Sequence, residues 1–131
     1  MNPTINEWVI RLSFAATGLI HVLPVAGLLG RPLLEGTYGV SLGEGHDLTI
    51  LMQHRALLFG LLATACFVAV AIPGWRCPAG IATLISMLGF VLIAALHAHG
   101  PSIARVVWID MGAAALMGLG LLLHFKSDRS T

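Results

Sequence analysis

Four long apolar runs, separated by short segments rich in glycine and proline, dominate this sequence of 131 residues. The runs extend over residues 8–29, 48–72, 79–96 and 102–125. A helix needs about 20 apolar residues to cross the roughly 30 Å hydrocarbon layer of a membrane. The runs have about this length, and their content of leucine and alanine favours helices over strands. The sequence therefore predicts an all-α fold, an integral membrane four-helix bundle that forms one four-span domain over residues 1–131, with a polar tail at 126–131.

The composition excludes several other classes of protein. Hydrophobic residues make up 57% of the chain and charged residues only 10%, whereas a soluble domain carries about 25% charged residues. A soluble monomer and a disordered chain are both excluded on these grounds. The net charge of +1 is too small for a nucleic-acid-binding surface. The expected partner is the lipid bilayer, and no nucleic acid is expected.

The connections between the runs contain residues that end helices. Residues 73–78 include two prolines, and Gly100-Pro101 separates the third run from the fourth. The first connection is longer. Within it, residues 31–35 predict a short helix after a proline, and residues 38–40 and 43–45 predict loop. We therefore expect a short outer helix or loop between the first and second spans.

The basic residues predict the orientation of the four spans. One side of the membrane, which also holds both termini, would carry Arg11, Arg76, Lys126 and Arg129. The other side would carry Arg31 and, near a helix end, Arg105. Because cytoplasmic segments are enriched in lysine and arginine, both termini are expected in the cytoplasm.

Ionisable residues inside the runs are the candidate functional residues, because a charged group in the bilayer interior costs at least about 2.5–3.5 kcal/mol. At about 1.5 Å per residue, His21, Arg55 and Asp110 each lie roughly 10–12 Å from the outer end of their helix. Three helices are thus expected to place ionisable groups at one level in the outer half of the membrane. The predicted ligand-binding or structural polar cluster comprises His21, His54, Arg55, Arg105 and Asp110.

Arg55 and Asp110 are predicted to pair, because each offsets the desolvation of the other. Two interpretations of this pair stay open. It is either a structural link between the second and fourth helices or one side of a polar pocket that opens to the outer face. Arg105 lies nearer the membrane surface and about 140° round the helix from Asp110, so the two are not expected to share a face.

The histidines differ in what their positions predict. Pro24 is expected to kink the first helix beside His21, which then either lines the pocket or hydrogen-bonds within the bundle. His54 either shares the pocket or faces another helix. His97 and His99 are poorly spaced for a metal site on a helix, and a haem needs axial histidines inside two spans. Neither a metal nor a haem is expected.

Four segments also match a known pattern: residues 18–24 (GLIHVLP), 38–40 (YGV), 52–60 (MQHRALLFG) and 103–110 (IARVVWID). On these segments the chain resembles the DoxX-like superfamily of small four-helix bacterial membrane proteins, over nearly its whole length. The resemblance implies a multi-pass protein of the bacterial cytoplasmic (inner) membrane. Some members of that group look like membrane subunits of quinone-linked sulfur oxidation. The resemblance supplies no set of catalytic residues, so these stay unknown.

Two functions are compatible with these residues. In the first, the protein binds a small molecule in the polar cluster or serves as an accessory subunit of a membrane or soluble partner. In the second, it is the membrane subunit of a quinone-linked oxidoreductase. In that case His21 or His54 hydrogen-bonds a quinone carbonyl and Asp110 relays the proton. The sequence contains no motif that decides between a binding protein and an enzyme.

Overall fold

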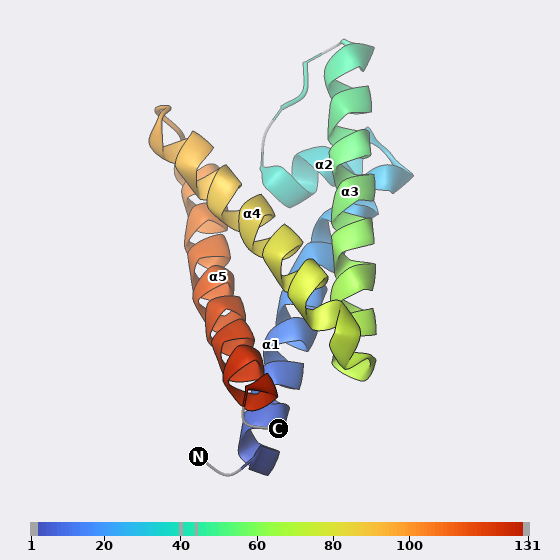
Figure 1. Cartoon of the computed structure of the whole chain (residues 1–131). Coiled ribbons are helices and arrows are strands. Elements are labelled where there is room, and N and C mark those ends of the chain that lie inside the picture. The colour runs from blue at the N-terminus through green and yellow to red at the C-terminus, as the bar shows by residue number, and fades with distance from the viewer. Residues whose placement is uncertain (1–2, 40, 44, 130–131) are drawn as a thin grey trace.

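The structure, a computed structural model, describes residues 3–39, 41–43 and 45–129. Every regular element among these residues is a helix, which confirms the predicted all-α class (Figure 1). In chain order the elements are α1 (Pro3–Val22), the 3₁₀ helix η1 (Leu23–Leu29), α2 (Arg31–Tyr38), α3 (His46–Ala71), the 3₁₀ helix η2 (Pro73–Trp75), α4 (Arg76–Ala95) and α5 (Pro101–Asp128).

The four long helices form a bundle in which consecutive helices run in opposite directions (Figure 1). Helix α1 packs against α3 and α5, and α4 packs against the same two helices, so α3 and α5 lie diagonally across the bundle. The first and last described residues lie at one end of the bundle, the termini end, and α2 lies towards the other, the α2 end.

The apolar stretches of the bundle are long enough to cross a membrane. They comprise Thr4–Leu29, His46–Ala71, Pro73–Ala95 and Pro101–Asp128. The protein therefore fits a small multi-pass membrane protein with four spans. The helices extend past several of the predicted limits, because helical hydrogen bonding continues into polar residues at the ends of an apolar run. In particular, α5 continues to Asp128, into residues predicted to be a tail.

The first span changes its helix type next to a proline. Helix α1 ends at Val22, and a 3₁₀ helix that contains Pro24 near its start continues the span. Proline has no amide hydrogen to donate to the carbonyl of Ile20, so the α-helical hydrogen-bond pattern cannot continue there. The irregularity that the sequence predicts in the first helix is thus a transition from α-helix to 3₁₀ helix.

Helix α2 packs onto the bundle through one fully buried side chain. Leu34 packs with Leu42 and Met52 and occupies the space where a side chain on Gly27 would lie. The helix extends to Tyr38, beyond the predicted residues 31–35, and ends at Gly39, which has a left-handed backbone (φ 62°). Val40 and Glu44, in the two predicted loops, lie outside the described residues.

Glu35 joins α2 to the loop that follows it. Its carboxylate accepts hydrogen bonds from the backbone N–H of Leu42 at 2.9 Å and from Arg31 Nε at 3.2 Å. Because both donors stabilise the ionised form, with the Leu42 N–H as the larger influence, the pKa of Glu35 lies below its usual range. The negative charge of Glu35 is therefore already balanced within this segment.

The hydrophobic core fills the half of the bundle nearer the termini. It contains Phe14 from α1, Cys66 from α3, Met87 from α4 and Met117 from α5, all nearly inaccessible. Buried hydroxyl groups within this half bond to helix carbonyls, as Ser13 does to Ile10 at 2.7 Å. The half of the bundle near α2 contains a pocket with ionisable side chains in its wall.

Two glycines of α5 provide a test of how tightly α5 packs against α1. A side chain on Gly120 would collide with Ser13, whose Cβ lies 2.9 Å from the position of the added carbon, whereas Gly118 has nothing within 4 Å. Gly120→Ala should therefore destabilise the protein by about 1–3 kcal/mol through overpacking. Gly118→Ala should be neutral or slightly stabilising, because alanine favours helix over glycine. Thermal unfolding of both variants in detergent measures the difference, and equal midpoints would contradict this packing.

Candidate binding pocket

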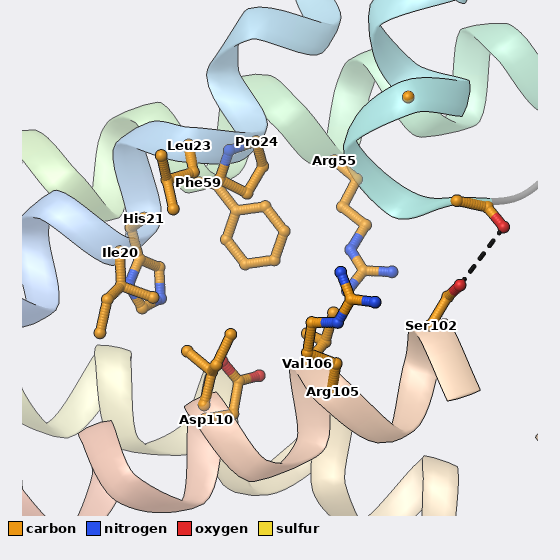
Figure 2. A pocket seen from close by; sticks show the side chains of 13 residues that line it. Ile20, His21, Leu23, Pro24, Arg55, Phe59, Ser102, Arg105, Val106 and Asp110 are labelled. Atoms are coloured by element: carbon orange, nitrogen blue, oxygen red, sulfur yellow. Dashed lines mark hydrogen bonds between the residues drawn. The ribbon is translucent and has the colours of Figure 1, made fainter. Parts of the chain in front are cut away.

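A pocket of about 270 Å³ lies inside the bundle on the side of α2 (Figure 2). Its wall combines apolar side chains with four ionisable ones, and it is formed by α1 with η1, α2, α3 and α5. The residues that line it are Ile20, His21, Leu23, Pro24, Gly36, Gly39, Arg55, Phe59, Ser102, Arg105, Val106, Ile109 and Asp110.

Arg55 and Asp110 lie at the same level of the bundle. Each is nine residues from the first residue of its helix, His46 or Pro101, or roughly 13 Å along the axis at 1.5 Å per residue. Because α3 and α5 are diagonal neighbours, side chains that point inward from them face a common interior. Both residues line the pocket.

Aromatic rings hold the guanidinium group of Arg55. Its Cζ atom lies 5.1 Å from the ring centroid of Phe59, one turn further along α3, and 5.0 Å from that of Phe90 on α4. Cation–π contacts at this distance contribute about 0.5–2 kcal/mol, most when water is excluded. The sequence predicts the Asp110 carboxylate as the partner of Arg55, whereas in the structure its guanidinium group contacts the two rings.

His21 both lines the pocket and hydrogen-bonds within the bundle. Its side chain is 3% exposed, its Nδ1 lies 2.9 Å from the carbonyl oxygen of Thr17, and its ring contacts the edge of Phe59 at a centroid distance of 5.4 Å. A carbonyl oxygen only accepts, so Nδ1 carries the hydrogen and donates it. In the neutral ring, Nε2 is then the acceptor. The two alternatives predicted for His21 are therefore both present.

Arg105 lies in the same pocket as Asp110, although their spacing on α5 separates them by about 140°. The long side chain of Arg105 accounts for this, since its guanidinium group can reach well beyond its own helix face. Figure 2 shows the guanidinium groups of Arg105 and Arg55 pointing into the pocket towards one another, from α5 and α3. Arg105 and Asp110, both members of the predicted cluster, therefore line the same pocket from different faces of α5.

The remaining predicted histidines lie elsewhere. His54 is exposed on the surface of α3 and does not line the pocket, because one residue along a helix turns the side chain by about 100°. His97 Nδ1 lies 2.9 Å from the carbonyl oxygen of Ile93, and His99 Nδ1 lies 3.1 Å from that of Ala94. The structure therefore brings together His21, Arg55, Arg105 and Asp110, and leaves out His54.

A second set of charged residues, at the termini end, was missed by the sequence reasoning. Arg76 is 3% exposed, and its Nη1 and Nη2 donate to the two carboxylate oxygens of Glu7 at 2.9 and 2.6 Å. Its Nε donates to the carbonyl oxygen of Ala69 at 3.3 Å, and Glu7 also accepts from Arg11 Nε at 2.7 Å. In the sequence, Glu7 and Arg76 each lie next to an apolar run, and the predicted spans place both at the same end of the bundle. This placement was the signal that could have predicted their contact. These residues join α1, α3 and α4.

Fold and pocket together define the class: a small four-helix membrane protein with an open pocket in its bundle and ionisable side chains in the pocket wall. The chain has no match among protein-family models, curated proteins or solved structures.

Proposed function

We propose that this protein binds a small molecule in the pocket formed by α1, α2, α3 and α5. The observation that carries the proposal is that four ionisable side chains from three helices surround a cavity of about 270 Å³. Known small-molecule sites are concave and mostly apolar, with a few polar groups that orient the ligand. The wall of this pocket likewise combines apolar side chains with a few polar and charged ones.

The proposal includes a membrane location and an orientation. The four spans and the resemblance of four sequence segments to the DoxX-like superfamily support the bacterial inner membrane. The basic residues at the termini end support cytoplasmic termini, so the pocket would lie in the outer half of the bilayer. A role as an accessory subunit of a membrane or soluble partner is part of the same proposal.

A quinone is the second candidate ligand, favoured by the presence of His21 and Asp110 in one pocket. Of the two histidines predicted to hydrogen-bond a quinone carbonyl, only His21 lies in the pocket, because His54 is exposed outside it. Since Nδ1 donates to Thr17, a neutral His21 accepts a hydrogen bond from a quinol hydroxyl at Nε2 and donates to a quinone carbonyl only when protonated. In this version a partner subunit supplies the electrons.

Filling the pocket tests the binding proposal. Val106→Trp adds an indole to the pocket wall without changing any charge and should abolish ligand binding. Met111→Trp is the matched control, because Met111 is 43% exposed on the surface of the same helix. Native mass spectrometry of the purified proteins should show a co-purified small molecule in the wild type and the control, and none in Val106→Trp. Equal retention by all three proteins would overturn the proposal.

A further inference from the structure

We propose that the pocket takes an amphiphile whose polar end is a single oxyanion, a carboxylate or a phosphate, held between Arg55 and Arg105. This inference rests on the proposed function, since it names the chemistry of the ligand in the same pocket. Three features of the pocket support it: its charge, the positioning of Arg55 and the division of its wall into polar and apolar parts.

The charges of the lining residues favour an anion. Among the described residues that line the pocket, two carry a full positive charge, Arg55 and Arg105, and one is a carboxylic acid, Asp110. Nowhere in the described part of the chain does Arg105 have an ion-pair or hydrogen-bond partner. The guanidinium groups of Arg55 and Arg105 carry like charges and point towards one another in Figure 2, so they repel. A bound oxyanion between them converts this repulsion into two attractive contacts.

The contacts of Arg55 suit it to bind an oxyanion. The Cζ atom of Arg55 lies over the rings of Phe59 and Phe90, 5.1 and 5.0 Å from their centroids, and guanidinium groups stack on aromatic faces. The N–H groups of a guanidinium lie in its plane and bind carboxylate and phosphate oxygens in pairs. Rings that restrict the orientation of this plane reduce the conformational entropy that ligand binding would otherwise cost. A lysine, which has no planar fork, could not use the rings in this way.

The rest of the pocket wall favours an apolar body on the ligand. Beyond the two arginines, the wall consists largely of aliphatic and aromatic side chains from η1, α3 and α5, such as Leu23, Phe59 and Val106. Helix α2 adds Gly36, and the residue after the helix, Gly39, also lines the pocket and accepts a hydrogen bond at its carbonyl oxygen from Ser102 Oγ of α5 at 3.5 Å. The apolar part of an amphiphile matches this wall, whereas a small hydrated anion would leave it in contact with water.

A pair of ligands with the same chain length, one with an anionic and one with a neutral head group, tests the inference. Isothermal titration in a neutral maltoside detergent would compare decanoate with decanol, which has the same number of carbon atoms. We expect decanoate to bind at least about tenfold more tightly, since a charge-assisted pair of hydrogen bonds has that order of effect. Arg105→Gln should remove most of this preference, and Arg105→Lys should retain part of it. Arg129→Gln, at the other end of the bundle, is the charge-matched control and should change nothing.

Arg105→Gln is the principal variant because Arg105 is exposed and its replacement leaves the core intact. Arg55→Gln should show the same loss of preference, provided that its unfolding midpoint stays at the wild-type value. Phosphatidylglycerol and phosphatidylcholine, added in place of decanoate, distinguish a lipid headgroup from a free fatty acid. Preferential binding of phosphatidylglycerol identifies an anionic phospholipid, and binding of decanoate alone identifies a monocarboxylate. Each result supports the inference.

Failure of this inference can be distinguished from failure of the proposed function. If decanol and decanoate bind equally and Val106→Trp abolishes both, the pocket binds small molecules but does not select an anion. If Arg105→Gln leaves the preference for decanoate unchanged, Arg105 contacts only the membrane surface and the inference is overturned. If no ligand binds and no molecule co-purifies, both proposals are wrong.

Discussion

Replacing Glu7 by alanine is expected to lower the free energy of unfolding by about 3 kcal/mol, near the lower end of the range for breaking a buried ion pair. Among the described residues, the substitution leaves Arg76, which is 3% exposed, with one acceptor, the carbonyl oxygen of Ala69. A buried guanidinium group without its carboxylate is strongly destabilising, because the burial of its charge is no longer compensated. The lower end of the range applies because the Glu7 side chain is itself 39% exposed. Thermal and denaturant unfolding in detergent would measure the loss.

The ion pair between Glu7 and Arg11 provides the matched control. It involves the same carboxylate, but Arg11 is exposed, and exposed pairs contribute about 0–1 kcal/mol. Arg11→Ala should therefore have little effect. The double variant Glu7→Leu, Arg76→Met, which removes both buried charges, should be milder than Glu7→Ala alone. If Glu7→Ala unfolds at the same midpoint as Arg11→Ala, the Arg76 contact does not stabilise the bundle.

Leu34→Ala is expected to release α2 from the bundle while the four long helices stay folded. Leu34 is fully buried, and Leu42 and Met52 pack against it. Removing a buried leucine side chain costs about 2–5 kcal/mol, and α2 has only eight residues, too few for an isolated helix to be stable in water. Amide hydrogen exchange should therefore accelerate in residues 31–39 and remain slow in the long helices.

Leu33 is the matched control for Leu34, because it is the preceding residue on the same helix and is 45% exposed. Leu33→Ala should leave hydrogen exchange in α2 unchanged. Since Gly36 and Gly39 line the pocket, Leu34→Ala should also weaken ligand binding without altering any charged residue of the wall. Protection of α2 equal to the wild type would show that Leu34 does not anchor it.

The spans and the level of their ionisable residues follow from local rules. A run of about 20 apolar residues specifies a spanning helix, and the constant rise of a helix puts Arg55 and Asp110 at one depth. The direction of each side chain does not follow in the same way. In a membrane protein both the lipid-facing and the core-facing sides of a helix are apolar, so the pattern of α3 does not distinguish the face of His54 from that of Arg55.

Long-range pairs were the other features that the sequence did not predict. Glu7 and Arg76 are 69 residues apart, and their contact depends on how α1 and α4 are placed in the bundle. The rings of Phe59 and Phe90 beside Arg55 require the packing of α3 against α4. In each case the sequence does not specify how the helices pack against one another.

The contact between Glu7 and Arg76 also bears on the biosynthesis of the protein. A ribosome delivers Glu7 with the first transmembrane segment, but Arg76 emerges only after the second one has been made. During that interval Arg11, one turn away, is the basic side chain already placed beside Glu7. Completion of the third segment brings Arg76 into place, and the first segment then becomes fixed to a part of the chain translated much later. Nascent chains that stop before residue 76 therefore lack the contact between Glu7 and Arg76, although they already contain α3, against which α1 packs.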